Sequence, residues 1–321
     1  MYNINNDIIV TIHKNEKDTI NHIKNSPKFI TSSYHHEYNT FVKYDYGPID
    51  ISNIIKFINF IDDIINNNKN KSKVIEYYVY ETNKKYDLLN CFFLFGCYLI
   101  HKHNYSVSEI LFNFTPLFND IVHYYTDCIS NNSGYVITFK DCLDTFYFIT
   151  KNNIINIETF DIDEYDKLSN LKYNDMTIIL DKFIAMSCPS NYNIQNIIDE
   201  LKKKNVKKII RLNEKKYDTQ LFTDNNIKIY DLYFEDMKTP SIDIVKKFFN
   251  IINKTNFDEL IAIHCHAGLG RTGLLICLWL INKYNFTPNN AIVFMRLMRP
   301  CSIMNNQGIF IESYNYISKY I

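Results

Sequence analysis

The segment Ile261–Leu280, which reads IAIHCHAGLGRTGLLICLWL, constrains the fold of this 321-residue chain more than any other segment. Its first residues, up to Cys265, are mostly apolar and predict a short strand, and its last residues predict a buried helix. Three of the chain's seven glycines, Gly268, Gly270 and Gly273, lie in or beside the turn between them. A strand, a glycine-rich turn and a buried helix in this order predict an α/β fold.

The same order of elements occurs in the N-terminal half of the chain. Val74–Tyr80 predicts a strand, Glu81–Asp87 a turn and Leu88–Ile100 a buried helix. A second, capped helix is predicted over Tyr105–Phe114, as one is predicted from Pro288 onward in the other half. The pattern favours a structural duplication over a chance match. The first copy has no cysteine, arginine or glycine in its turn, so we expect it to be catalytically silent.

Composition and charge exclude several classes of function. The chain has 35 basic and 35 acidic residues and a pI of about 7.1, so we expect no broad electrostatic binding of nucleic acid or of an anionic membrane. No segment predicts a membrane span or a signal peptide. The eight cysteines lack the spacing of a zinc site and the density of a disulfide scaffold, which predicts a reduced intracellular protein, cytoplasmic, nuclear or both. The asparagine-rich run Ile64–Lys73 predicts a solvated loop.

The turn HCHAGLGRT carries groups that together predict a phosphate site. The loop itself consists of His266, Ala267, Gly268, Leu269 and Gly270. Its glycines allow successive backbone N–H groups to point inward, and the following helix adds the positive end of its dipole. Arg271, six positions after Cys265, can bind two oxygens of a tetrahedral dianion at once.

Cys265 is the candidate nucleophile of this site. The positive field of the loop favours the thiolate form of its side chain, and a thiolate beside a bound phosphate can form a cysteinyl-phosphate. Thr272 can place a hydroxyl beside the sulfur and ease its departure, whereas His264 is expected to hold the loop through hydrogen bonds. A structural turn with an inert cysteine would explain the glycines but not the C-x5-R spacing. The loop differs from a Walker A loop, because it lacks the Gly-Lys-Ser/Thr ending.

Such a site needs an acid that protonates the leaving oxygen. A predicted strand is followed by Glu235 and Asp236 at the start of a loop, from which either carboxyl group could reach over the pocket. The residues alone favour Asp236 and leave Glu235 open. Asp231 lies inside the strand pattern and is expected to be structural. The next helix is expected to open at Pro240, with Thr239 as its N-cap.

The loop HCHAGLGRTG resembles the phosphate loop of cysteine-dependent protein tyrosine and dual-specificity phosphatases. The wider sequence resembles one branch of them, the mitotic-exit, proline-directed dual-specificity phosphatases of the cell-division-cycle family. The stretches that carry this resemblance are Phe41–Phe57, Asp181–Ser190, Ile209–Ile227, Asp231–Ser241 and Arg296–Phe310. The resemblance implies two tandem dual-specificity-phosphatase-like domains, each a central mixed sheet flanked by helices. It implies a non-catalytic domain over residues 1–160, a linker that contributes to the substrate groove over 161–178, and a catalytic domain over 179–321.

The resemblance also implies roles for single residues. Asp236 becomes the general acid, and Gln307 matches a glutamine that helps to position water for hydrolysis of the intermediate. Arg211 and Tyr217 fall on recurrent family positions, and we interpret both as structural around the pocket.

The family prefers phosphoserine followed by proline, with a basic residue further on. Apolar loop side chains, here Ala267 and Leu269, help to accommodate the proline. Acidic linker residues attract the basic residue, and the acids in this chain are Glu164, Asp166 and Asp175. An ordinary solvated linker surface is the alternative interpretation of the first two. The chain departs from the family at five positions. Ser169 and Lys172 stand where the family usually has acidic residues, and His266 stands where it has lysine. Met237 and Cys301 stand where it has glycine.

These observations predict a protein phosphatase that needs neither a metal nor a cofactor. The resemblance implies that its substrates are phosphoproteins, dephosphorylated at phosphoserine or phosphothreonine followed by proline, Ser-Pro sites above all, and at phosphotyrosine, in cell-cycle or cytoskeletal regulation. We expect no role for nucleic acid or membrane. A phosphoinositide or RNA 5′-phosphatase would use the same C-x5-R chemistry, but Leu269 occupies a place where lipid phosphatases usually carry lysine. A non-catalytic phosphoprotein-binding protein would be expected to lack the cysteine, the arginine or the acid.

Overall fold

The computed structural model describes residues 2–5, 8–13, 16–25, 30–31, 47–68, 75–80, 86–116, 124–126, 135–172, 174–304 and 306–314. The chain divides into two compact units. Unit 1 comprises Met1–Tyr125 and Ile137–Asn152, and unit 2 comprises Thr126–Val136 and Asn153–Ile321. The predicted linker at 161–178 therefore groups with unit 2, while the two predicted domain boundaries, at 160/161 and 178/179, stay a prediction.

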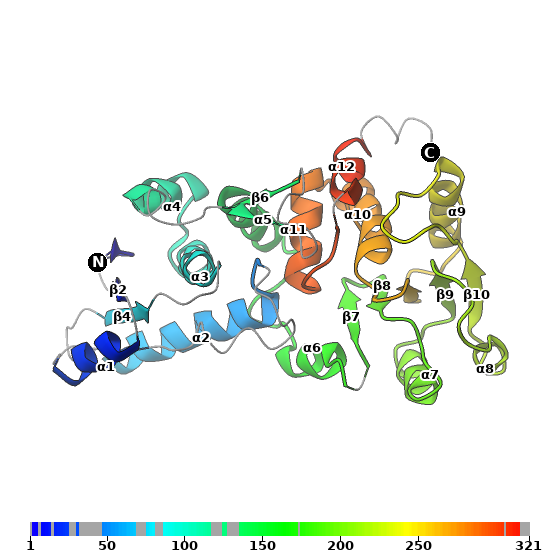
Figure 1. Ribbon diagram of the computed structural model, residues 1–321, viewed down its shortest axis with the longest axis horizontal. Helices are drawn as coiled ribbons and strands as arrows, with labels where there is room; N and C mark the ends of the chain where they lie inside the picture. Colours follow the sequence, from blue (N-terminus) through cyan, green and yellow to red (C-terminus); the bar gives the residue numbers. More distant parts are fainter. Residues whose placement is uncertain are drawn as a thin grey trace. The chain divides into compact units, whose positions relative to one another are not determined.

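Unit 1 is a mixed α/β unit (Figure 1). In chain order its described elements are β1 Tyr2–Asn3, β2 Ile8–His13, α1 Glu16–Asn25, β3 Ile30–Thr31, α2 Ile51–Asn68, β4 Ile75–Tyr80, α3 Asp87–His103, α4 Val107–Phe114, β5 Tyr124–Tyr125, β6 Ile137–Thr138 and α5 Phe139–Lys151. The larger sheet has the order β1-β2-β4-β3, in which β2, β4 and β3 are parallel and β1 is antiparallel. The predicted strand over Val74–Tyr80 and the predicted buried helix over Leu88–Ile100 are confirmed as β4 and α3.

Aromatic side chains join these elements in the core of unit 1. The ring of Phe95 on α3 meets Tyr77 of β4 and Phe57 of α2 edge-on, with ring centroids 5.0 Å apart in both pairs. All three side chains are 0% exposed, so α3 is fixed on the sheet by buried apolar area.

The prediction of a solvated loop over Ile64–Lys73 is wrong for its first half. Helix α2 continues to Asn68, because buried residues Ile54, Ile58 and Ile61 recur at helical spacing and hold the helix against the core. Asparagine costs a helix only a few tenths of a kcal/mol per residue, so the asparagine run does not end it. Three stretches used in the sequence analysis lie outside the described residues. They are the rest of that loop (69–74), most of the predicted turn (81–85) and part of a stretch that carries the resemblance (41–46).

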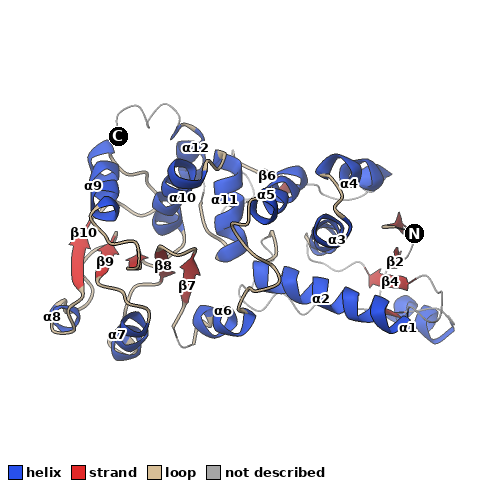
Figure 2. Cartoon of the chain, turned by 180° about the vertical axis from the view of Figure 1, so that it is seen from behind, coloured by secondary structure: helices blue, strands red, loops and turns tan. Residues whose placement is uncertain are grey.

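Unit 2 contains a five-stranded mixed sheet with helices on both faces (Figures 1 and 2). Its elements are α6 Ile162–Ser169, β7 Met176–Ile179, β8 Phe183–Met186, α7 Ile194–Lys203, β9 Lys208–Arg211, α8 Gln220–Thr223, β10 Lys228–Asp231, α9 Ile242–Asn253, β11 Ile261–His264, α10 Gly270–Tyr284, α11 Pro288–Met298 and α12 Asn306–Glu312. The strand order is β10-β9-β11-β8-β7, with β7 antiparallel and the other four parallel. The expected fold class, two mixed-sheet α/β units flanked by helices, is confirmed.

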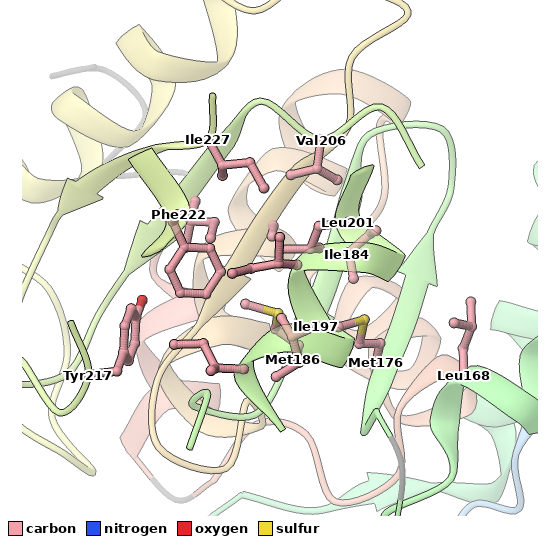
Figure 3. Packing of buried hydrophobic residues seen from close by; sticks show 14 residues of the cluster. Leu168, Met176, Ile184, Met186, Ile197, Leu201, Val206, Tyr217, Phe222 and Ile227 are labelled. Carbon is pink, nitrogen blue, oxygen red and sulfur yellow. The ribbon is translucent and has the colours of Figure 1, made fainter. Parts of the chain in front are cut away.

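Alternate residues of the central strands of unit 2 point to opposite faces. On one face, Ile184 and Met186 of β8 belong to the cluster drawn in Figure 3. Helix α7 adds its buried residues at helical spacing to the same cluster, namely Ile194, Ile197, Ile198 and Leu201. On the other face, Phe183 stacks on Phe248 of α9 and meets Trp279 of α10 edge-on, at centroid distances of 5.9 and 5.0 Å. The central strands are therefore covered on both sides and are rigid supports for the loops that follow them.

The two units repeat one detail that supports a structural duplication. Helices α3 and α10 both end at an asparagine in the left-handed conformation, Asn104 with φ 56° and Asn285 with φ 55°. Two residues later, Ser106 and Thr287 cap the next helices by accepting a hydrogen bond from a first-turn backbone N–H. The cap of α4 is completed by Glu109, as its sequence predicts.

The predicted start of one helix in unit 2 is wrong by two residues. The N-cap of α9 is Ser241, whose Oγ accepts from the backbone N–H of Ile244 at 3.4 Å, and not Thr239. Serine is a more favourable N-cap than threonine, and Pro240 precedes the cap instead of following it. In the described residues, no helix is both long enough and apolar enough to cross a membrane.

Candidate active site

The loop after β11 begins at the carboxyl end of the central strand of unit 2. β11 lies between β8 and β9, parallel to both, and each of its residues is buried. Cys265 follows directly and is 3% exposed. The segments that follow the neighbouring strands β8 and β9 hold this turn on both sides. The backbone N–H of Cys188 donates to His266 O (2.8 Å), and that of Leu212 donates to His264 O (2.9 Å). The start of the loop is therefore fixed by the sheet itself.

The two loop glycines are needed for different reasons. Gly268 has φ +68°, and a Cβ there would lie 2.0 Å from Met186 O, so its conformation and its surroundings both require glycine. The explanation by backbone freedom is wrong for Gly270, whose φ is not in the left-handed region. A Cβ at Gly270 would lie 2.8 Å from Oε1 of Gln307, so this glycine allows a close approach of that side chain.

Gln307 on α12 connects the loop with the segment that carries the candidate acids. Its side chain is 0% exposed, and its Oε1 accepts from the backbone N–H of Met304 at 3.1 Å. Its Nε2 donates to Lys238 O at 3.5 Å, a long contact. The predicted glutamine thus lies against Gly270 of the loop. It also contacts the backbone of Lys238, which is two residues after Asp236 in the chain.

Arg271 is buried at the start of α10 and spans the site. It is 1% exposed, and its Nη1 donates to Phe234 O (2.9 Å) and to Leu212 O (3.2 Å). Its Nε lies 3.2 Å from Oδ1 of Asp236, an ion pair without the angle of a hydrogen bond. Two fixed carbonyls therefore orient the guanidinium, while its Nε keeps donor capacity for another acceptor.

Of the two candidate acids, Asp236 is the one that is paired with Arg271. Its side chain is 62% exposed, and its Oδ1 also accepts from the backbone N–H of Met237 at 3.1 Å. Met237 itself has φ 61°, a left-handed conformation that disfavours a side chain, at the position where a glycine is usual. Glu235 is exposed, and its backbone O accepts from the N–H of Lys238 at 3.3 Å.

His264, the last residue of β11, supports the start of the loop as a neutral imidazole. It is 0% exposed, and burial lowers its pKa to about 4. Its Nδ1 donates to Cys265 O at 3.0 Å, because a carbonyl can only accept. Its Nε2 therefore accepts from the hydroxyl of Tyr217, at 2.8 Å. Burial raises the pKa of Tyr217, so this hydroxyl remains protonated and able to donate.

Arg211 and Asp231 extend this support toward β10. Arg211 is 1% exposed and donates to both carboxylate oxygens of Asp231, from Nε at 2.6 Å and from Nη2 at 3.1 Å. These hydrogen bonds lower the pKa of Asp231. The guanidinium lies over the Tyr217 ring, 5.0 Å from its centroid. Arg211, Tyr217 and Asp231 thus contact the site through His264, in line with the structural roles expected for them.

Thr272 follows Arg271 and is fully buried. Its Oγ1 has no hydrogen-bond partner among the described residues. Its hydroxyl is therefore available to a group in the site, while the predicted contact with the sulfur of Cys265 stays a prediction. In the same described ranges, no group of three or more His, Cys, Asp or Glu side chains is arranged to hold a metal ion.

Comparisons with known proteins show which family this chain resembles. A family model described as the N-terminal half of dual specificity protein phosphatases matches residues 4–148, and one described as a DSP-PTPase phosphatase of polymorphic toxin systems matches residues 184–285. The tyrosine-protein phosphatase CDC14 of Candida albicans is 31% identical over 84% of this chain and 51% of its own length. Human dual specificity protein phosphatase CDC14A is 30% identical over 90% of this chain and 51% of its own length. The chain belongs to the CDC14 family of dual-specificity phosphatases.

This chain spans about half the length of the CDC14 proteins it matches. Among solved structures, a putative protein tyrosine phosphatase from Leishmania major matches 42% of this chain and 90% of its own at 25% identity and a TM-score of 0.39.

The acids predicted for the substrate groove of a CDC14-type protein are mostly engaged within unit 2. Glu164 on α6 forms an ion pair with Lys204. Asp175, just before β7, forms an ion pair with Arg299, with 2.8 Å between Oδ1 and Nη2. Asp166, also on α6, is half-buried. The structure therefore does not present these carboxylates as one free acidic surface.

Arg299 is a site residue that the sequence interpretation missed. It follows α11, is 4% exposed and donates to the loop carbonyls of Ala267 and Gly268 at 3.1 and 2.9 Å. Its only signal in the sequence is its place in the CDC14-like stretch Arg296–Phe310. Nothing local distinguishes it from Arg296, which donates to Ser302 O and Ile303 O instead.

Proposed function

We propose that this chain is a cysteine-dependent protein phosphatase that acts through a cysteinyl-phosphate. The observation that carries the proposal is the pairing of the buried Arg271 with Asp236 beside the loop of Cys265. A permanently charged guanidinium buried in front of a nucleophile is suited to a dianion, and a carboxyl group at the same place is suited to proton transfer.

In the proposed first step, the sulfur of Cys265 attacks phosphorus as the ester oxygen leaves. The leaving oxygen takes its proton from the carboxyl group of Asp236, so that an alcohol or phenol departs and not its anion. Arg271 and the loop N–H groups bind the equatorial phosphoryl oxygens, and the phosphate takes the place of Asp236 as the partner of Arg271 Nε. Neither a metal nor a cofactor is needed for these roles.

In the proposed second step, water attacks the cysteinyl-phosphate and gives a proton to the carboxylate of Asp236. In this proposal, that water is oriented by the side-chain amide of Gln307, which lies against Gly270. The sulfur leaves as a thiolate, and the unpartnered hydroxyl of Thr272 can donate to it. Inorganic phosphate then leaves, and the starting protonation of the site is restored.

The proposed substrates are intracellular phosphoproteins, in the cytoplasm, the nucleus or both, dephosphorylated at phosphotyrosine and at phosphoserine or phosphothreonine followed by proline. The half-buried Leu269 and the exposed Ala267 of the loop offer the apolar contact that a proline ring would need. The CDC14 relatives are named tyrosine-protein and dual specificity protein phosphatases, which supports phosphoproteins as the substrates.

The test compares the whole chain with its Cys265→Ser variant on a small aryl phosphate in the presence of a chelator. We expect turnover by the unmodified chain and none by Cys265→Ser. The same two proteins are then given Ser-Pro, Thr-Pro and Tyr phosphopeptides, an inositol phospholipid and a 5′-phosphorylated RNA. Turnover that survives Cys265→Ser, depends on an added metal, or is confined to the lipid or the RNA would contradict the proposal.

A further inference from the structure

The outward-facing carbonyls of the phosphate loop have an unusual donor. When the N–H groups of such a loop turn inward toward an anion, its carbonyl groups turn away and need partners elsewhere. The buried guanidinium of Arg299 supplies them: its Nε donates to Gly268 O (2.9 Å) and its Nη2 to Ala267 O (3.1 Å). One rigid, planar group thereby fixes two successive peptide units of the loop.

The same guanidinium is itself held from β7 and the residue before it. Its Nη1 donates to Oγ1 of Thr177 at 3.2 Å, and its Nη2 donates to Oδ1 of Asp175 at 2.8 Å. Thr177 is 2% exposed, and the Asp175 side chain is 19% exposed. Asp175 also has φ 46°, a conformation that aspartate tolerates better than most residues. The left-handed backbone of Asp175 thus accompanies the contact between its carboxylate and Arg299.

We propose that Asp175, through Arg299, is a positioning residue for the phosphate loop and not a binding site for a basic side chain of the substrate. The inference rests on the proposed function, because it assigns a role in that reaction. We call the four contacts of Arg299 with Asp175, Thr177, Ala267 and Gly268 the loop clamp.

The charge of the clamp explains why Asp175 is a poor docking site. Its carboxylate already neutralises a guanidinium that is 4% exposed, and removing one partner of such a pair leaves a buried charge without compensation. A substrate lysine would have to compete with that pair. Glu164 is likewise paired, with Lys204, so two of the three acids predicted for the groove are neutralised within this chain. We therefore expect at most a weak preference for a downstream basic residue.

The clamp predicts an effect on every substrate, because every phosphate must enter the same loop. In Asp175→Asn, Arg299 loses its charged partner and the two loop carbonyls lose a fixed donor. A displacement of about 1 Å at a catalytic group can lower the rate about 100-fold. A substrate-docking acid, in contrast, affects only substrates that carry the basic residue.

The experiment measures kcat and KM of the whole chain and its variants on three substrates. These are a small aryl phosphate, a Ser-Pro phosphopeptide with a downstream lysine, and the same peptide with alanine instead. We expect Asp175→Asn to lower kcat/KM about 10- to 100-fold and equally, within twofold, for all three. Arg299→Lys should lower it at least as much, because lysine keeps the charge but cannot bind two carbonyls in one plane.

Two further variants control for folding. Glu259→Gln removes a similar ion pair, in which Glu259 and Lys208 are each 17% exposed and 3.1 Å apart, at the other end of the strands. It should leave all three activities within twofold of the unmodified chain. Thr177→Val removes only one contact of the clamp at nearly constant volume, and should lower kcat/KM by a smaller factor, about two- to fivefold, again for all three substrates.

The outcomes separate this inference from the proposed function. If Asp175→Asn raises KM only for the lysine peptide, Asp175 is a docking residue and the inference is wrong. If neither Asp175→Asn nor Thr177→Val changes any activity, the clamp has no positioning role. If the unmodified chain hydrolyses none of the substrates, the proposed function fails instead. In that case, the binding of inorganic phosphate, measured by calorimetry, tests the loop clamp. We expect Asp175→Asn to bind phosphate more weakly than the unmodified chain, and equal binding would contradict the inference.

Discussion

Both units place a buried helix after a parallel strand, but they treat the polar groups in its first turn differently. In α3 of unit 1, Oδ1 of Asn90 accepts a hydrogen bond from the buried hydroxyl of Tyr125 at 2.8 Å. In α10 of unit 2, Nε of Arg271 and Oγ1 of Thr272 are buried without hydrogen-bond partners among the described residues. Buried polar groups are nearly always satisfied, so those of α10 indicate where a ligand belongs.

The two regions therefore share a scaffold and differ in what it is used for. The polar residue of α3 stabilises its own unit, whereas the polar residues of α10 retain donor capacity that a phosphate can use. The difference rests on few residues, and substitutions in either helix start can test it.

The largest expected effect comes from Arg271→Lys. A lysine cannot keep both carbonyl contacts of Arg271 and also bind two phosphoryl oxygens, so we expect kcat/KM to fall by about 10³-fold or more. Steady-state kinetics on an aryl phosphate measure this loss. A change of less than tenfold would contradict the role of Arg271.

The matched substitution in the other helix is Asn90→Ala. It removes the acceptor of the Tyr125 hydroxyl and should lower the free energy of unfolding by about 1–2 kcal/mol, measured with urea. Turnover per folded molecule should not change. If turnover is lost as in Arg271→Lys, the distinction between a structural and a catalytic helix start is wrong.

The next effect distinguishes the two candidate acids. Asp236→Asn should lower kcat by about 10²- to 10³-fold, because the amide keeps the size of the side chain but cannot give up a proton to the leaving oxygen. Glu235→Gln should stay within twofold of the unmodified chain, because the ion pair with Arg271 belongs to Asp236. The opposite result would move the general acid to Glu235. The comparison uses an alkyl phosphopeptide, whose leaving group depends on protonation.

The sequence predicts those parts of the site that depend on local chemistry. The strand, the glycine turn and the helix follow from residue pattern, and Cys265 and Arg271 follow from their spacing on one loop. Gly268 is also predictable, because its left-handed conformation is a local property. The same holds in unit 1 for the cap formed by Ser106 and Glu109.

Contacts between residues far apart in the chain could not be predicted in this way. Gly270 is required by Gln307, and the acceptors of Arg299 include a residue of the linker that was expected to bind substrate. Asp175 has the same residue type whether it binds a substrate lysine or an arginine of its own chain. Only the packing of β7 beside the loop separates the two roles.

A smaller effect concerns the free energy of unfolding, which we expect to depend on pH because His264 is neutral in the folded protein. The pKa of His264 is about 4 in the folded protein and about 6.5 in an unfolded chain. Between these values the unfolded state binds a proton that the folded state does not. The free energy of unfolding therefore falls as the pH falls from about 6.5 to about 4, by up to about 3 kcal/mol.

The measurement is urea unfolding of the unmodified chain and of His264→Gln at several pH values. The variant lacks this titrating group, so its free energy of unfolding should fall less steeply over the same window. Equal slopes would show that the imidazole is not held neutral in the folded protein.

The smallest effect concerns backbone strain near the site. In the described part of unit 1, asparagine occupies a left-handed position at Asn104, and unit 2 has left-handed asparagines such as Asn285 but also Cys301 and Met237, at φ 65° and 61°. Cysteine tolerates this conformation less well than asparagine. Cys301→Gly should therefore raise the free energy of unfolding by about 0.5–1 kcal/mol, after allowing for the greater freedom of glycine in the unfolded chain. Asn104→Gly should change it by only a few tenths, and the two values from urea unfolding can be compared directly.

Trapping the intermediate tests whether the loop after β11 performs covalent chemistry. The whole chain is mixed with an aryl phosphate, quenched in acid within milliseconds and digested, and the peptides are analysed by mass spectrometry. We expect phosphate on Cys265, more of it in Gln307→Ala, where attack by water is slowed, and none in Cys265→Ser. Hydrolysis of the substrate with no phosphate on Cys265 in any of these samples, or with phosphate on another residue, would contradict this expectation.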